Sequence, residues 1–176
     1  MTKKLPFVLG FAASSGTGKT SLLTQLLPLL KQQGLKVAVI KHSHHDVEID
    51  QPGKDSFRLR MAGATPVLLA SAYRQILIAE HDPQLPVSLA EQLALLQNYE
   101  LDLILVEGFR QEAFAKIELH RPSLGKPLLY PHDPNIIAIA SDSRLPVPAD
   151  LPLLDLNDIQ AILAFILDCY QELAHD

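Results

Sequence analysis

The sequence predicts an α/β fold in which helices cover both faces of a mostly parallel β-sheet. Strand-like apolar runs alternate with helix-like runs along most of the 176 residues, which is the sequence form of repeated strand–helix–strand units. Several strand-like runs are apolar at every position, as expected for strands buried on both faces of a sheet. The length and the hydrophobic content of 48% favour a single domain over residues 1–176, with a β-hairpin inserted at about 65–80.

The first part of the chain predicts a strand, a turn and a helix. Residues 7–12 form a continuous apolar run, residues 13–18 are small and flexible, and leucines follow at helical spacing over 19–33. Gly34 stands where a left-handed helix cap is expected. Pro28 lacks the N–H that an inner helical position donates, so we expect a bend or an early break there.

The middle of the chain predicts a second strand, a polar loop, a short helix and a hairpin. These cover residues 36–41, 42–53, 55–61 with Gly63 as its cap, and 65–70 paired with 75–79. Ser88 and Glu91 form a capping box ahead of a helix expected over about 89–98.

The last third predicts three further strands and a C-terminal helix. Buried strands are expected at 101–107 and 136–140, and residues 115–120 alternate like a half-exposed strand. The four prolines of residues 121–135 indicate a loop without regular structure. A second proline-rich loop at 146–152 leads to Leu153 and Leu154, and Asn157 or Asp158 caps the final helix.

Composition excludes several classes of protein. A charged fraction of 20% and a mean hydropathy of +0.14 are incompatible with wholesale disorder. A net charge of −5 argues against nucleic acid as a partner. No apolar run approaches the roughly 20 residues that cross a bilayer, and a lone cysteine, Cys169, agrees with a reducing compartment. We expect a cytoplasmic protein with neither a nucleic-acid nor a membrane partner.

The turn after the first strand is a Walker A motif. Its sequence is Ala13-Ser14-Ser15-Gly16-Thr17-Gly18-Lys19-Thr20, and the strand before it and the helix after it provide the required context. Small residues let successive N–H groups converge on phosphate oxygens, and the positive end of the helix dipole faces the same anion. The fold class is therefore narrowed to the three-layer P-loop NTPases. Ala13 stands where glycine is common, so the loop would be mildly strained if that position needs a positive φ.

Residue roles follow from this motif. Lys19 is expected to neutralise the β- and γ-phosphates, and the hydroxyl of Thr20 to ligate Mg²⁺. Thr17 and Ser21 are expected to make further phosphate contacts. The acid of the magnesium shell should stand at the carboxyl end of a neighbouring strand, which selects Glu107 over Asp102 at the start of the same run. Gly108, directly after it, would let the backbone approach the γ-phosphate.

Four segments together resemble the MobB family of P-loop proteins. They are the run from Gly10 to Thr20, the run from Ile40 to His45, Gly53-Lys54-Asp55-Ser56 with Arg58 and Ala62-Gly63-Ala64, and Leu105-Val106-Glu107-Gly108-Phe109. The resemblance implies a GTP-binding protein with Mg²⁺ and slow GTP hydrolysis, in which Lys19 and Glu107 are the catalytic residues. It further implies an adaptor role in molybdopterin guanine dinucleotide biosynthesis, with partners such as the guanylyltransferase of that pathway.

The sequence leaves the roles of two further sites undecided. His42, His44, His45 and Asp46 leave the second strand at the same sheet edge as the P-loop. They fit a switch or substrate loop, solvated loop residues, or a transition-metal site, although a structural zinc site usually has separated ligand pairs. The Asn-Lys-x-Asp motif that recognises guanine is absent. Asp142 follows the apolar run 136–140, where a carboxylate could accept the guanine N–H groups, but an aspartate at this position is also common in turns.

Hydrolysis is expected to be slow because the sequence identifies no water-orienting glutamine or arginine finger. The arginines at 58, 60, 74, 110 and 121 are candidates that also fit surface cations. The alternatives to a GTP-binding adaptor are a P-loop kinase or ligase that phosphorylates a small acceptor, and a non-catalytic nucleotide-binding module. The apolar hairpin would leave an exposed sheet edge, so we expect it to join a second subunit in a homodimer.

Overall fold

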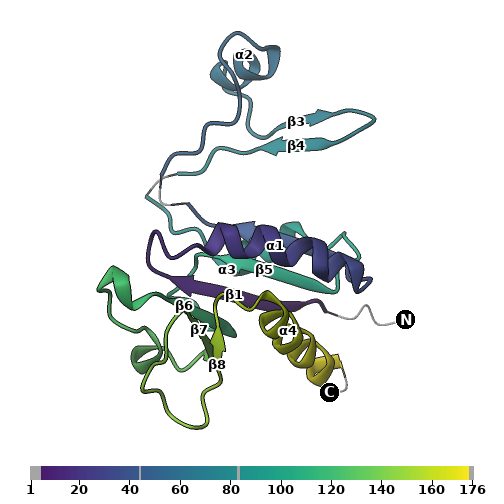
Figure 1. Ribbon diagram of the computed structural model, residues 1–176. Coiled ribbons are helices and arrows are strands. Elements are labelled where there is room, and N and C mark those ends of the chain that lie inside the picture. Colours follow the sequence, from purple (N-terminus) through teal and green to yellow (C-terminus); the bar gives the residue numbers. More distant parts are fainter. Residues whose placement is uncertain (1–4, 44, 83, 175–176) are drawn as a thin grey trace. The chain divides into compact units, whose positions relative to one another are not determined.

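The chain forms two compact units in the computed structural model, which describes residues 5–43, 45–82 and 84–174. One unit consists of Met1–His42 and Leu89–Asp176, and the other of Ser43–Ser88 (Figure 1). The second unit is larger than the hairpin insertion expected at about 65–80, because it also contains helix α2 (Asp55–Met61). We call these the core unit and the inserted unit.

The core unit contains a parallel sheet of six strands in the order β2-β5-β1-β6-β7-β8. Their bounds are β1 Phe7–Ala13, β2 Val37–Lys41, β5 Leu103–Glu107, β6 Lys116–His120, β7 Ile136–Ser141 and β8 Leu153–Asp155. Glu107 is in register with Phe11 on one side and Lys41 on the other. The P-loop, Glu107 and the end of β2 therefore meet at the carboxyl edge of the sheet, where ligands bind in parallel α/β folds.

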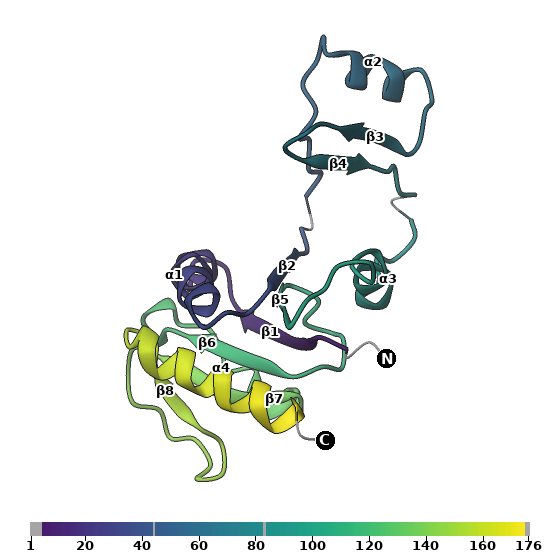
Figure 2. The same ribbon diagram turned by 90° about the vertical axis from the view of Figure 1, so that its right-hand side faces the viewer.

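Helices cover both faces of this sheet, as the sequence predicts (Figure 2). Helices α1 (Lys19–Gln32) and α4 (Ile159–Ala174) pack on one face with the odd-numbered side chains of β1, such as Leu9 and Phe11. Helix α3 (Leu89–Leu95) packs on the other face with Ile104 and Val106. Since side chains alternate along a strand, each central strand contributes to both apolar clusters.

Local sequence signals fix the ends of α1 and α4. Gly34 has a φ of 81° and donates its N–H to the carbonyl of Lys31, while Leu35 donates to Leu30, so the expected left-handed cap is confirmed. Asp158 rather than Asn157 caps α4, because its Oδ1 accepts the N–H groups of Gln160 and Ala161 at 3.0 Å each.

Two helix predictions are corrected. Helix α1 continues past Pro28 to Gln32. Pro28 is exposed, so the carbonyl that loses its partner faces solvent and no break is needed. Helix α3 ends at Leu95 rather than near Asn98, because Leu96 and Gln97 donate to carbonyls three residues back and tighten the chain into a turn.

The segment after β5 differs most from expectation. All five residues of β6 are buried, although its alternating charges predicted a half-exposed strand. Residues 121–135 were expected to be irregular but contain two short 3₁₀ helices, η1 (Pro122–Leu124) and η2 (Tyr130–His132). Pro122 is the first residue of η1 and Pro131 the second residue of η2, positions in the first turn where the missing N–H of proline costs little. This segment is the cover that buries the charged face of β6.

The inserted unit is built on an antiparallel hairpin of β3 (Val67–Ala70) and β4 (Gln75–Ile78). Its turn does not use Asn-Gly chemistry. Instead, the hydroxyl of Ser71 accepts the N–H groups of Tyr73 and Arg74. Helix α2 carries Arg60, whose guanidinium forms ion pairs with Glu48, Asp50 and Glu80. The side chain of Arg60 is only 12% exposed, so this one residue joins the beginning, the helix and the end of the unit.

Of the helices in the described residues, none combines the length and apolar character that crossing a membrane would need.

Candidate functional site

The P-loop follows β1 directly and supplies the left-handed turns that its motif predicts. Gly16 and Gly18 have φ values of 81° and 102°, and Gly18 caps the start of α1. Phe109 is the single non-glycine residue with positive φ in the described part of the chain. Ala13 therefore avoids the strain anticipated for that position. Of the other P-loop residues, Thr17 is buried, while Ser15, Thr20 and Ser21 are exposed.

Side chains hold several carbonyl groups of the P-loop. The Nζ of Lys19 donates to the carbonyls of Ala13 at 3.2 Å and Ser14 at 3.3 Å. The hydroxyl of Thr17 also donates to the Ser14 carbonyl, at 2.8 Å. In a trans peptide the N–H points away from its neighbouring carbonyl. Each tied carbonyl thus leaves the following N–H directed the opposite way and available to an anion.

Lys19 lies among charged groups of both signs. Burial lowers its pKa, an effect that Arg110 and Lys41 reinforce and Glu107 opposes. Glu107 itself forms an ion pair with Lys41 at 3.4 Å and is 14% exposed. The arrangement concentrates positive charge around one carboxylate at the carboxyl edge of the sheet. Such a cluster suits a polyanion that brings its own cation.

The backbone after Glu107 is tightly packed against the end of β2. His42 donates its N–H to the carbonyl of Glu107 at 2.8 Å, and its ring stacks on Phe109 with centroids 4.4 Å apart. Gly108 and Phe109 have φ values of 108° and 51°, so two successive residues are in the left-handed region. Glycine adopts such a φ without strain, whereas Phe109 is a non-glycine residue in a strained conformation of the kind that clusters at functional sites.

Asp142, directly after β7, forms an ion pair with Arg121. Its Oδ2 lies 2.6 Å from the Nη1 of Arg121, and the Nε of the same guanidinium donates to the carbonyl of Thr17 at 2.9 Å. The register of β6 and β7 pairs His120 with Ser141, which brings the next residues of both strands together. Arg121 therefore bridges the P-loop and the residue expected to read the base.

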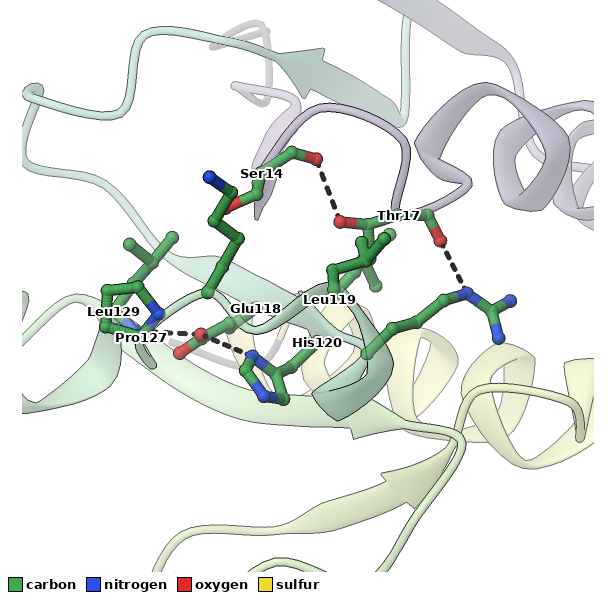
Figure 3. Close-up of a pocket in the computed structure, with 10 residues that line it drawn as sticks. Ser14, Thr17, Glu118, Leu119, His120, Pro127 and Leu129 are labelled. Carbon is green, nitrogen blue, oxygen red and sulfur yellow. Dashed lines mark hydrogen bonds and ion pairs between the residues drawn. The ribbon is translucent and has the colours of Figure 1, made fainter.

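The charged face of β6 lies next to the P-loop (Figure 3). The Glu118 carboxylate accepts the N–H groups of Leu129 and Tyr130 at 2.8 Å each, and His120 lies 3.9 Å away. Burial raises the pKa of Glu118, against the lowering effect of those two donors. Lys116 forms an ion pair with Asp133 at 2.8 Å. A small cavity of about 10 Å³ separates Glu118 and His120 from Ser14 and Thr17.

Two larger cavities flank the bridge made by Arg121. One of about 310 Å³ is lined by Gly16, Gly18, Arg121 and Asn157, among others. The other, of about 380 Å³, is lined by Asp142 and its neighbours and by the end of β8. The first lies beside the start of α1 and the residues that follow β8, and the second lies at the carboxyl ends of β7 and β8. Both are at the edge of the sheet where ligands bind in parallel α/β folds.

The expected switch loop is divided between the two units. His42 belongs to the core unit and packs beside Glu107, Gly108 and Phe109. His45 and Asp46 are exposed residues of the inserted unit, and His44 lies outside the described residues. Among the residues that the structure describes, no group of three or more His, Cys, Asp or Glu side chains is arranged to hold a metal ion.

Sequence reasoning missed the residues that support this site. Lys116 and Glu118 were not predicted to take part, and Arg110 and Arg121 were candidates that also fitted surface cations. Arg110 lies near the P-loop, with Nη1 3.5 Å from the Ala13 carbonyl. The available signal was the alternation Lys-Ile-Glu-Leu-His in a strand of a parallel sheet. Such strands are normally apolar on both faces, so three charged or polar side chains on one face indicate buried partners.

Comparison of the sequence with known protein families agrees with this geometry. The family model described as "Molybdopterin guanine dinucleotide synthesis protein B", or MobB, matches residues 8–142. The chain belongs to the MobB family. The matched range begins in β1 and ends at Asp142, so it contains both the P-loop and the bridge made by Arg121.

Individual MobB proteins are similar over nearly the whole chain. The molybdopterin-guanine dinucleotide biosynthesis adapter protein of Escherichia coli is 43% identical over 94% of each chain. The protein of the same name from Haemophilus influenzae is 42% identical over 94% of this chain and 90% of its own. A crystal structure of Bacillus subtilis MobB matches with a TM-score of 0.70 and 26% identity, covering 93% of this chain and 96% of that one.

Proposed function

We propose that the chain is a GTP-binding adaptor of molybdopterin guanine dinucleotide biosynthesis that hydrolyses Mg-GTP slowly. The observation that carries this proposal is the P-loop of a MobB-family chain, with Lys19 at its base and Glu107 beside it. The adaptor role is taken from the names of the Escherichia coli and Haemophilus influenzae relatives.

The residues present fit a nucleotide with its magnesium ion. The hydroxyl of Thr20 and the carboxylate of Glu107 are hard oxygen donors of the kind that Mg²⁺ prefers, and they come from the P-loop and its neighbouring strand. When bound, the ion would neutralise developing charge on the β- and γ-phosphates. Lys19 would orient the same oxygens, and Ser14, Ser15, Gly16, Thr17, Gly18 and Ser21 would contribute their N–H or hydroxyl groups.

The nucleoside would extend towards Asp142. A cavity of about 310 Å³ is lined by Arg121 and the P-loop, and one of about 380 Å³ is lined by Asp142. The Oδ2 of Asp142 is held by Arg121, and its Oδ1 accepts the hydroxyl of Ser143 at 3.3 Å. The carboxylate keeps further acceptor sites, which suit the N1–H and N2–H groups of guanine. Gly108 would present its N–H to the γ-phosphate.

Slow hydrolysis follows from what surrounds Lys19. The other cations at the site already have partners. Arg121 is bonded to Thr17 and Asp142, Lys41 forms an ion pair with Glu107, and Arg110 contacts the carbonyl of Ala13 at 3.5 Å. An arginine that is already paired does not stabilise transition-state charge as an arginine finger does. The expected rate is that of a nucleotide switch or carrier, in keeping with an adaptor.

The hairpin of the inserted unit supports a homodimer. Leu68 and Leu77 are paired across β3 and β4 and are 60% and 53% exposed. A two-stranded sheet with exposed leucines is marginal by itself, and a second copy of the chain would cover it.

A turnover experiment separates this function from the alternatives. Hydrolysis of Mg-GTP would be followed for the wild type and Glu107→Gln, alone, with molybdopterin, and with the guanylyltransferase of the pathway. We expect slow release of phosphate by the wild type, loss of release in Glu107→Gln, and no phosphorylated acceptor. A phosphorylated product would favour the kinase or ligase, and tight binding without any turnover would favour the non-catalytic module.

A further inference from the structure

The side chain of Arg121 connects the phosphate-binding loop to the end of β7. It follows β6, and Asp142 follows β7, so the parallel register sets the two side by side. Nε donates to the Thr17 carbonyl at 2.9 Å, and Nη1 donates to Asp142 at 2.6 Å. The side chains of Arg121 and Asp142 are 32% and 23% exposed, so both contacts are partly shielded from water.

The contact with Thr17 bears on the phosphate subsite. Thr17 and Gly18 share a peptide group, whose carbonyl is fixed by Arg121 and whose N–H therefore points the opposite way. Gly18 has a φ of 102° and is the first residue of the helix cap. The Nη2 of Arg121 would lie 3.9 Å from a β-carbon at Gly18, which places the guanidinium directly against this peptide. Arg121 thus orients one N–H of the P-loop.

The contact with Asp142 bears on the nucleoside subsite. A charge-assisted hydrogen bond of 2.6 Å restricts the carboxylate to one orientation. The same guanidinium lines both the cavity beside the P-loop and the small cavity next to Glu118. A lysine would present a single charge on a flexible stem and would not hold both partners, because it lacks the planar fork of arginine.

We propose that Arg121 is a positioning residue that fixes the Thr17–Gly18 peptide and the Asp142 carboxylate as a unit, so that triphosphate and nucleoside are engaged together. This inference rests on the proposed binding of GTP. It assigns to Arg121 a role in binding that neither the Walker A motif nor Glu107 supplies.

The test compares two ligands that use different parts of the site. Tripolyphosphate with Mg²⁺ reaches only the P-loop, whereas Mg-GTP reaches the P-loop and Asp142. Calorimetric affinities would be measured for the wild type, Arg121→Ala, Arg121→Lys, Asp142→Asn and the double variant Arg121→Ala/Asp142→Asn. The exposed Lys31, in the last turn of α1 and away from the P-loop, provides the control Lys31→Ala.

We expect Arg121→Ala to weaken both ligands by about 10-fold, the loss typical of a hydrogen bond to a charged group. Asp142→Asn should weaken GTP and leave tripolyphosphate unchanged. The double variant should bind GTP no more weakly than Arg121→Ala, because removing Arg121 already releases Asp142. Arg121→Lys should recover part of the tripolyphosphate affinity and little of the GTP affinity. Lys31→Ala should bind both ligands like the wild type.

Wild-type affinities in Arg121→Ala, or losses of GTP affinity that simply add in the double variant, would overturn the inference and leave the proposed function standing. A wild type that binds tripolyphosphate but not GTP, or binds neither, would overturn both. If Arg121→Ala does not fold, Arg121→Lys decides the question by the ratio of its two affinities, which loss of folded protein alone does not change.

Discussion

Gly108 and His42 are packed so closely that a β-carbon at position 108 would lie 2.6 Å from the Cβ of His42. Gly108 also has a φ of 108°, which L side chains rarely adopt. The same histidine stacks on Phe109 and donates to the Glu107 carbonyl. The end of β2 and the residues after Glu107 therefore form one rigid corner of the site.

Gly108→Ala is expected to break this corner. The substitution must move the His42 backbone as well as adopt a strained φ, so we expect a loss of unfolding free energy of about 2–3 kcal/mol, measured by urea denaturation. Gly125 is the matched control, because its φ of 59° is also positive but its β-carbon would meet nothing within 4 Å. Gly125→Ala should cost about 1 kcal/mol. Equal losses in the two variants would show that the contact with His42 does not matter.

Asp133→Asn is expected to destabilise the loop of residues 121–135 that covers β6. Lys116 is 1% exposed and pairs with Asp133 at 2.8 Å, so the variant leaves a buried ammonium without its counter-charge, at a cost of about 3 kcal/mol. The exposed Asp150 supplies the control Asp150→Asn, for which we expect no change. Urea denaturation at pH 7 measures both.

The ion pair between Lys116 and Asp133 predicts that the free energy of unfolding depends on pH. Burial acts to raise the pKa of Asp133, but Lys116 and Asn135 outweigh it and lower the pKa below its ordinary value of 3.8. A carboxyl with a lowered pKa stabilises the folded state above its ordinary pKa, and this contribution is lost as the pH falls through the lowered value. The stability difference between wild type and Asp133→Asn should therefore persist down to about pH 4 and shrink below it. A difference that stays constant below that pH would contradict this assignment.

Arg60→Met is expected to loosen the inserted unit without affecting the core unit. Its guanidinium pairs with Glu48 and Glu80 at 2.7 and 2.8 Å, which join the two ends of the unit. Hydrogen exchange should accelerate within Ser43–Ser88 and stay unchanged in β1 and β5. Arg58→Met is the control, since the Arg58 side chain is 77% exposed. Unchanged exchange in Arg60→Met would show that the hairpin alone maintains the unit.

Much of the fold could be predicted because its signals are local. Glycines that need positive φ, such as Gly18 and Gly34, mark the ends of α1, and apolar runs mark the central strands. The Walker A motif places Lys19 and Thr20 with its neighbours, and strand polarity selects Glu107 over Asp102. The carboxylate of Asp102 indeed accepts the N–H of Lys36 at the opposite end of the sheet.

The remaining parts of the site depend on contacts between segments far apart in the sequence. Arg121 reaches Thr17 across more than a hundred positions, and no periodicity encodes that contact. The burial of Lys116 and Glu118 depends on the loop after β6, where the backbone N–H groups of Leu129 and Tyr130 satisfy a carboxylate. The sequence pattern alone predicts that such charged residues are exposed, because charged side chains are rarely buried unless they are paired.

The exposed hairpin predicts a change in oligomeric state. Leu68→Asp places a charge on the apolar face of β3, which a partner subunit would have to bury at high cost. Sedimentation equilibrium should report a dimer for the wild type and a monomer for this variant. Leu95, on α3 of the core unit and 62% exposed, gives the control Leu95→Asp, which should remain dimeric. A wild type that is monomeric at all concentrations would contradict the dimer.

The most direct test of the central claim is equilibrium binding of GTP and ATP, each with and without Mg²⁺, to the wild type and Lys19→Ala. Lys31→Ala, an exposed lysine at the far end of α1, is the control. We predict Mg²⁺-dependent binding that favours GTP over ATP in the wild type and Lys31→Ala, and at least about a 10-fold loss in Lys19→Ala because a cation is removed from the phosphates. Equal affinity for the two nucleotides, or wild-type affinity in Lys19→Ala, would contradict the claim that the P-loop binds Mg-GTP.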